Sequence, residues 1–345
     1  MRFMSVTHVV PERVVTNGDI LTEFSARVGA HVDPATLSAM RKSLETCLEY
    51  AGSQARRHRQ ATDRAVDFGL EAGRRAIASA GLVPEDIDLL LYVGVGRGFI
   101  EPATANLFQA ELGCRRATCF DILDACASWL RAVDVARHYT RCGSARHVLI
   151  VNCEFNFREY ANWDLRAVAD LETAWAAFTI GEAATATVLG PGGDDDDFHV
   201  RFENAGQAHD LCYIPLPNFD QFHCSPTDPP RAPLRFYSNS APLTRLAVGL
   251  LQEQYRADPA FHGRDYDLIL THAASSRVAV AGIRGMGLDT GLFHDVFPRF
   301  GNTVSASLPL AMADAIESGR LQRGQRVLML MGSAGVAAGL ANFTY

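Results

Sequence analysis

Short segments of aliphatic and β-branched residues alternate along this chain with longer helical patterns. The segments predicted as strands are 88–95, 147–153, 184–189, 267–272 and 326–332, and those predicted as helices are 65–80, 104–112, 127–140, 242–255 and 309–318. Strands that alternate with helices favour an α/β fold in which the helices cover a sheet.

The order of these elements repeats in the second half of the chain. The sequence EDIDLLLYVG follows one predicted helix, and RDYDLILTHA follows a later one; RCGSARHVLIVN and LQRGQRVLMLMG are related in the same way. An internal repeat of this kind predicts two similar halves. The run GPGGDDDD at 190–197 interrupts regular structure, so we expect the halves to span residues 1–190 and 191–345.

Two irregular stretches have alternative interpretations. The four consecutive aspartates before residue 198 fit a metal-binding loop or a solvated turn, and the mutual repulsion of their charges favours the turn. The proline-rich stretch 214–234 fits either a cover over a substrate channel or a segment that wraps the surface.

Composition excludes several classes of protein. The formal net charge of −7 provides no electrostatic footprint for nucleic acid. No apolar run reaches the roughly 18 residues of a membrane span, and the start MRFMSVTHVV does not resemble a signal peptide. The eight cysteines form no C-x-x-C pair and no zinc-like spacing. We therefore expect a cytoplasmic protein with reduced thiols, no metal and no membrane span.

Cys126 lies in FDILDACASWLRAV, where an apolar approach runs directly into a helical pattern. A cysteine at a helix start faces unpaired amides and the positive end of the helix dipole, which lower a thiol pKa. A thiolate there would attack acyl thioesters. Taken alone, the same residue fits a buried structural cysteine, because free Cys is among the most buried residue types.

Three further segments carry groups that suit the same chemistry. His272 ends the predicted strand LILTH, where an imidazole can exchange a proton or donate to a developing oxyanion. Asn302 lies in the loop FGNT before a helix and would add a neutral amide donor. The glycines of Gly332-Ser333-Ala334-Gly335 would let backbone amides approach a ligand. This segment does not match the G-x-S-x-G elbow of serine hydrolases.

These segments together resemble the ketoacyl synthase III branch of the thiolase-like condensing enzymes. The pieces that carry the resemblance are FDILDACAS, LILTHAAS and FGNTVSASLPLA, within a match that extends from VVPERVVTN to GSAGVAAGLANF. The resemblance implies a thiolase-like five-layered αβαβα fold from two duplicated halves, and a homodimer. It also implies that no cofactor is permanently bound and that acyl-CoA or acyl carrier protein thioesters are the substrates.

The resemblance assigns roles to individual residues. Cys126 would be the nucleophile, the backbone amides of Cys126 and Ala334 would form the oxyanion hole, and His272 with Asn302 would hold the enolate of a second thioester. The family commonly has His-Gln-Ala-Asn where this chain has His-Ala-Ala-Ser, at 272–275. This departure points away from housekeeping fatty-acid initiation and toward a specialised pathway.

Glu101 precedes Pro102 in GRGFIEPATANLF. The run resembles that of head-to-head condensing and pyrone-forming ketosynthases, in which this loop reaches into the partner subunit and the Glu is taken as a base. A carboxylate in an apolar pocket has a raised pKa and can remove an α-proton from a donor that carries no carboxyl group to lose. The alternative is an exposed loop Glu that caps the following helix.

Arg56, Arg57 and Arg59 form the densest basic cluster of this acidic chain. They could bind the phosphate of a phosphopantetheine arm or the acidic face of a carrier protein. A solvated surface cluster is the alternative interpretation.

The leading hypothesis is a ketosynthase that loads an acyl group on Cys126 and condenses it with a second acyl or β-ketoacyl thioester. An acyltransferase that forms an ester or amide on the same scaffold is the alternative. A third possibility is a non-catalytic subunit that supports an active homologue, against which the presence of Cys126, His272 and Asn302 argues.

Overall fold

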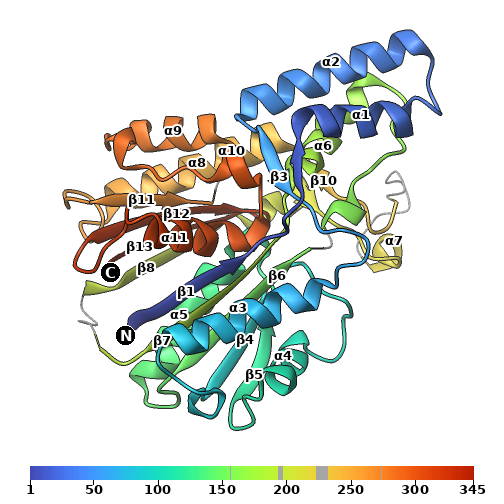
Figure 1. Ribbon diagram of the computed structural model, residues 1–345. Coiled ribbons are helices and arrows are strands. Elements are labelled where there is room, and N and C mark those ends of the chain that lie inside the picture. The colour runs from blue at the N-terminus through green and yellow to red at the C-terminus, as the bar shows by residue number, and fades with distance from the viewer. Residues whose placement is uncertain (156, 193–196, 223–231, 273) are drawn as a thin grey trace.

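The computed structural model describes residues 1–155, 157–192, 197–222, 232–272 and 274–345, and its main feature is a pair of sheets (Figure 1). The first sheet has the order β1-β7-β6-β4-β5 and consists of β1 (Arg2–Val9), β4 (Leu89–Val93), β5 (Thr118–Ile122), β6 (Val148–Glu154) and β7 (Ala183–Gly190). The second has the order β11-β12-β13-β8 and consists of β8 (His199–Asn204), β11 (Leu268–Thr271), β12 (Arg326–Ser333) and β13 (Ala337–Thr344). Two short pairs also form, β2 (Val14–Thr16) with β3 (Ala55–Arg57) and β9 (Cys212–Tyr213) with β10 (Tyr237–Ser238).

Helices form three layers around and between the two sheets (Figure 1). The outer layers are α3 (Ala65–Ser79) with α4 (Thr104–Leu112), and α8 (Ser240–Ala257) with α9 (Ser276–Gly285); the central layer is α5 (Ser128–Arg141) with α11 (Ser307–Glu317). The remaining helices are α1 (Asn17–Val28), α2 (Pro34–Ala51), α6 (Leu171–Ala174), α7 (Phe219–Phe222) and α10 (Phe297–Phe300). The order of layers is αβαβα, as the thiolase-like fold requires.

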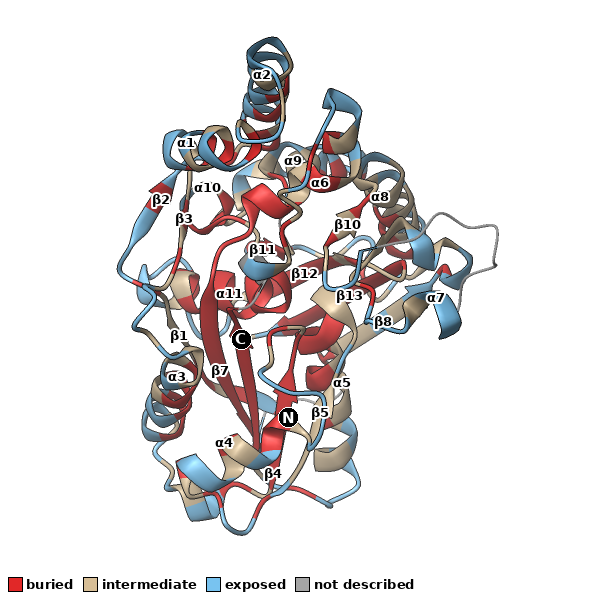
Figure 2. Ribbon diagram, turned by 90° about the vertical axis from the view of Figure 1, so that its right-hand side faces the viewer, coloured by how far each residue is buried: buried red, intermediate tan, exposed pale blue. Residues whose placement is uncertain are grey.

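Residue alternation along β4 explains why a sheet lies between two helical layers. Leu89, Leu91 and Val93 pack into the central core, whereas Leu90 and Tyr92 pack toward α3 and α4. Successive side chains of a strand point to opposite faces, so an entirely apolar strand must be covered on both sides. Figure 2 shows the consequence, since β4, β7 and α11 are largely buried while much of α2 is exposed.

The two sheets are built alike. In the first, β6 pairs parallel with β4 and antiparallel with β7, which pairs antiparallel with β1. In the second, β12 pairs parallel with β11 and antiparallel with β13, which pairs antiparallel with β8. The second sheet has no full strand equivalent to β5 among the described residues. At that position, only an isolated parallel bridge joins Ile269 of β11 to Phe293. The repeat in the sequence is therefore a repeat of the fold.

The predicted strands and helices all form, with ends that differ by at most two residues. The prediction did not include β1, β5, β8, β13, α1 or α2. Residues 193–196 of the predicted turn, and residues 223–231 of the proline-rich stretch, lie outside the described residues. Asp197 is described, and its carboxylate lies 2.8 Å from Arg326 Nη2. None of the described helices is long and apolar enough to cross a membrane.

Candidate active site

Cys126 lies in a single 3-10 turn, Ala125–Ala127, that leads directly into α5. Ala125 has a φ of 44°, a left-handed conformation that a residue with a side chain seldom adopts. Ser128 holds the turn, because its Oγ accepts from the Asp124 amide at 2.8 Å and donates to the Ala125 carbonyl at 2.7 Å. The predicted position of Cys126 at a helix start is confirmed.

The second half contains a matching turn. Val304 has a φ of 52° and begins the 3-10 turn Val304–Ala306, which leads into α11 as the first turn leads into α5. Asn302 lies just before this turn, and its backbone is fixed on both sides: its N–H donates to the Thr179 carbonyl and its carbonyl accepts from the Gly181 amide, each at 3.0 Å. Two strained turns therefore present their side chains at the junction of the two halves.

The Asn302 side chain has a defined orientation. Its Oδ1 accepts from the Val304 amide at 2.9 Å, so the acceptor of the side-chain amide is occupied. The amino group is then left to donate into the space that Asn302 lines.

The end of β12 is tied to the nucleophile turn. Ser333 Oγ accepts from the Ala127 amide and donates to the Asp124 carbonyl, both at 3.2 Å. Ala334 follows Ser333 directly, so these bonds fix its backbone relative to Cys126.

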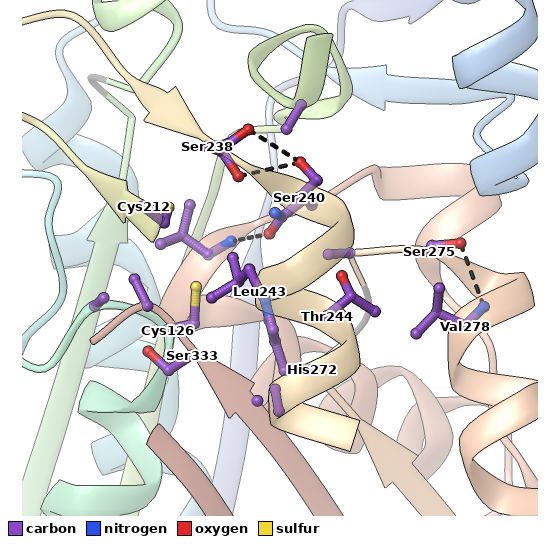
Figure 3. A pocket seen from close by; sticks show the side chains of 18 of the residues that line it. Cys126, Cys212, Ser238, Ser240, Leu243, Thr244, His272, Ser275, Val278 and Ser333 are labelled. Atoms are coloured by element: carbon purple, nitrogen blue, oxygen red, sulfur yellow. Dashed lines mark hydrogen bonds between the residues drawn. The ribbon is translucent and has the colours of Figure 1, made fainter. Parts of the chain in front are cut away.

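A cavity of about 650 Å³ brings the predicted residues together. Cys126, His272, Asn302 and Ala334 all line it, and Figure 3 shows Cys126 and His272 around the same space as Cys212. The volume is in the range of cavities that enclose small-molecule ligands. Most of the other lining side chains are aliphatic or aromatic, so an apolar acyl group fits the space.

Burial decides the charge state of the two titratable groups. It raises the pKa of the Cys126 thiol well above its ordinary value. Burial also lowers the pKa of His272 to about 4. A hydrogen bond with the Val304 backbone raises this pKa, but by less than burial lowers it. The prediction of a lowered thiol pKa is therefore wrong, because desolvation outweighs the helix start. The resting pair is a neutral thiol and a neutral imidazole.

The C-terminal part of the chain, residues 258–345, matches the family model for the C-terminal domain of 3-oxoacyl-[acyl-carrier-protein] synthase III. Residues 120–206 match the model for 3-oxoacyl-[acyl-carrier-protein] synthase III itself, and the two matches together cover half of the chain. The chain belongs to the ketoacyl synthase III family.

Relatives in this family align along nearly the whole chain. The beta-ketoacyl-[acyl-carrier-protein] synthase III of Methylococcus capsulatus is 29% identical over 337 residues, which cover 97% of this chain and 96% of that one. The synthase III of Listeria innocua is 27% identical over 343 residues, with the same coverage.

Solved structures show the same ketoacyl synthase III fold. The 3-oxoacyl-[acyl-carrier-protein] synthase III of Aquifex aeolicus superposes with a TM-score of 0.80 at 22% identity, covering 99% of both chains. OleA of Xanthomonas campestris, solved with lauric acid and lauroyl-CoA, superposes with a TM-score of 0.81 at 22% identity, covering 99% of this chain and 98% of OleA.

Glu101 is exposed in the loop between β4 and α4 and is not among the cavity-lining residues. Two interactions fix this loop beside the end of β5: Arg97 contacts the Asp121 carboxylate at 3.3 Å, and the same carboxylate accepts from the Thr104 amide at 2.9 Å. Asp121, rather than Glu101, therefore accepts from the start of α4. Within a single chain, Glu101 is not part of the cavity with Cys126.

The predicted arginine cluster is not an open anion-binding surface. Arg56 is fully buried and donates to the Val15 carbonyl, to Asn17 Oδ1 and to Ser53 Oγ, and burial lowers its pKa to about 10. For Arg56 the prediction of a carrier contact is wrong, because a buried side chain cannot reach a carrier. Arg57 donates to the Glu12 carbonyl at 2.9 Å, and Arg59 contacts the Glu159 carboxylate at 2.8 Å. Carrier binding by these two remains a prediction.

Sequence reasoning missed a buried polar group beneath the site. The Glu154 carboxylate, at the end of β6, accepts from the Val95 amide at 3.1 Å, from the Gly96 amide at 2.7 Å and from Ser305 Oγ. Ser305 takes the place in the second turn that Cys126 takes in the first. The sequence signal for the equivalence of Ser305 and Cys126 is the shared pattern of DACAS at 124–128 and TVSAS at 303–307.

The charge states predict how Cys126 reacts with pH. A thiol with a raised pKa gains thiolate steadily as pH rises, so alkylation of Cys126 by iodoacetamide should increase about tenfold per pH unit from about pH 6 to pH 9. A thiolate–imidazolium pair would instead give a plateau near neutral pH. Peptide mass spectrometry measures the rates. The exposed Cys142 is the internal control, because a hydrogen bond with Ser144 lowers the pKa of its thiol and its rate should level off at lower pH.

Proposed function

We propose that this ketoacyl synthase III relative is a ketosynthase that joins two acyl thioesters by a Claisen condensation in specialised lipid or polyketide biosynthesis. The observation that carries the proposal is the cavity in which Cys126, His272, Asn302 and Ala334 meet. The substrates are acyl groups on coenzyme A or on acyl carrier protein. The names of the synthase III relatives support the carrier protein.

In the first step, Cys126 Sγ attacks the thioester carbonyl carbon. His272 is neutral and takes the thiol proton, and the backbone amides of Cys126 and Ala334 face the oxygen on which negative charge develops. The carrier thiol leaves with a proton returned by His272, and the acyl group remains on Cys126.

In the second step, a second thioester forms an enolate. His272 and the free amino group of Asn302 donate to the enolate oxygen. The enolate carbon attacks the acyl carbon, a carbon–carbon bond forms, and the bond to Cys126 Sγ breaks. The products are a β-ketoacyl thioester and the Cys126 thiolate, which becomes the thiol again by taking up a proton equivalent to the one removed from the second thioester.

The proposal includes a homodimer that completes the site. Strand β5 is the edge of the first sheet, and an unprotected edge can pair with another copy. Large apolar side chains lie exposed in this region: Phe99 and Ile100 beside Glu101, and Leu123 at the rim of the cavity. Burial of this face against a second copy would place the two Glu101 loops next to the partner cavities. Glu101 would then act as the base that forms the enolate.

Replacement of Glu101 tests its role as a base. Glu101→Gln should slow condensation of two acyl thioesters about 10²-fold or more, because general-base catalysis contributes about that much. A malonyl thioester, which forms its enolate by losing carbon dioxide, should be condensed at the original rate. Glu111→Gln is the matched control, since Glu111 is exposed on the neighbouring α4. Undiminished acyl–acyl condensation by Glu101→Gln would exclude the base role.

Product analysis tests the reaction as a whole. Incubation with acyl-CoA or acyl carrier protein thioesters should give a β-ketoacyl compound, identified by mass spectrometry. An ester or amide product would instead establish the alternative acyltransferase. A chain that no thioester acylates would point to a non-catalytic subunit.

A further inference from the structure

The cavity extends along a groove between α8 and α9. Lining residues recur at helical spacing on both elements. Those on α8 are Ser240, Ala241, Leu243, Thr244, Arg245, Ala247, Val248 and Leu251, and those at and along α9 are Ser275, Val278, Ala279, Gly282 and Met286. Positions three and four apart lie on one face of a helix. Each set spans 12 residues, so at a rise of 1.5 Å per residue the groove follows the helices for about 16 Å.

The chemistry of this groove changes along its length. Its outer end carries the hydroxyl groups of Ser240, Thr244 and Ser275, which Figure 3 shows near the N-terminal ends of the two helices. Its inner end is lined by Leu251, Met286 and other buried apolar side chains. A substrate arm with amide groups suits the outer end, whereas the inner end offers only desolvation to an alkyl chain.

The end of β12 contacts both the nucleophile turn and α8. Gly332 lies at the end of β12, and a Cβ atom at this position would lie 3.1 Å from Ala247 Cβ of α8. The next residue, Ser333, is hydrogen-bonded to the nucleophile turn. A chain attached to Cys126 therefore reaches the groove past a residue that has no side chain.

Gly282 determines how much room the inner end provides. A Cβ atom at this position would meet Val248 Cγ1 at 3.7 Å, an ordinary van der Waals contact, and nothing closer. An alanine therefore fits without displacing a neighbour. A leucine would extend three further carbon atoms into the groove between α8 and α9.

We propose that the inner groove holds the linear alkyl chain of the acyl group on Cys126, and that Gly282 is a specificity-determining residue for chain length. The inference rests on the proposed acylation of Cys126. It assigns the substrate class as unbranched acyl groups longer than acetyl, accommodated within a single chain rather than across the edge near Glu101. The driving force is removal of the alkyl chain from water.

Acyl loading without a second substrate tests this inference. The full-length protein is incubated with acetyl, octanoyl or myristoyl thioesters of coenzyme A, and the rate of Cys126 acylation is followed by intact-protein mass spectrometry. Gly282→Leu should reduce loading of the octanoyl and myristoyl groups about tenfold or more, because alkyl chains lose their space. Loading of the acetyl group by Gly282→Leu should stay within about twofold of the original rate.

The outcomes separate this inference from the proposed function. Equal loading of long chains by Gly282→Leu and the unaltered protein overturns the groove assignment and leaves Cys126 acylation intact. Failure of the unaltered protein to load any of the three groups overturns the proposed function itself. Normal acetyl loading by Gly282→Leu also shows that the variant is folded, so a selective loss of long chains supports the groove.

Discussion

Cys126→Ala should abolish acylation of the protein, lowering the rate of acyl transfer from a thioester about 10³-fold or more. The acyl group needs a covalent acceptor, and the other groups proposed for this step stabilise charge or move a proton. Intact-protein mass spectrometry after incubation with an acyl thioester measures the loss directly. The cavity and the oxyanion donors should survive, because alanine removes one sulfur atom from a turn that Ser128 holds.

Cys212 offers a matched control for this prediction. It lines the same cavity and burial raises the pKa of its thiol to about 11, but it lies on the two-residue strand β9 and not at a helix start. Cys212→Ala should keep acyl loading within about threefold of the original rate. Transfer of the label to Cys212 in the Cys126→Ala protein would contradict the assignment of the nucleophile.

Strands could be predicted where their own residues are strongly apolar. The segment LLLYV of β4 needs no neighbour to be recognised, because a short run of this kind is typical of a strand buried on both faces. The segment AAGLANFT of β13 contains small residues with little intrinsic preference for a strand. It is extended because β12 and β8 pair with it on its two sides, and these pairings cannot be seen in a local pattern.

The positions of the candidate site residues could be predicted, but their environments could not. A helix start can be recognised from DACASWL, yet the burial that raises the pKa of Cys126 comes from segments far away in the chain. The prediction for Arg56 was wrong for the same reason. The density of the cluster in an acidic chain favoured a surface role, whereas the partners of Arg56 are Val15 on β2, Asn17 at the start of α1 and Ser53 between α2 and β3.

The two duplicated halves place different side chains at equivalent turns. In each half a 3-10 turn leads directly into a central helix, and each turn begins with a residue of positive φ. The first turn directs Cys126 toward the cavity, whereas in the second turn Ser305 bonds the buried Glu154 and Val304 lines the cavity. The second turn thus supports Asn302 and contributes no nucleophile of its own.

Asn302→Asp should separate the two steps of the proposed reaction. The substituted side chain keeps its shape and an oxygen that can accept from the Val304 amide, but the amino group that donates into the cavity becomes a second acceptor. A carboxylate next to an enolate also repels its charge. The proposed acylation step relies on the Cys126 and Ala334 amides and not on Asn302, so it should stay within about threefold of the original rate.

Condensation by Asn302→Asp should fall about 10²- to 10³-fold, the usual effect of removing one donor to a developing oxyanion. Mass spectrometry of the intact protein measures acyl loading of Cys126. Release of the β-ketoacyl product from the preloaded protein measures the second step. Loss of both steps together would mean that Asn302 organises the whole cavity and not the enolate alone. Unchanged condensation would leave His272 as the donor that stabilises the enolate. A selective loss of the second step is expected because the bond from Val304 fixes the amide orientation before any substrate arrives.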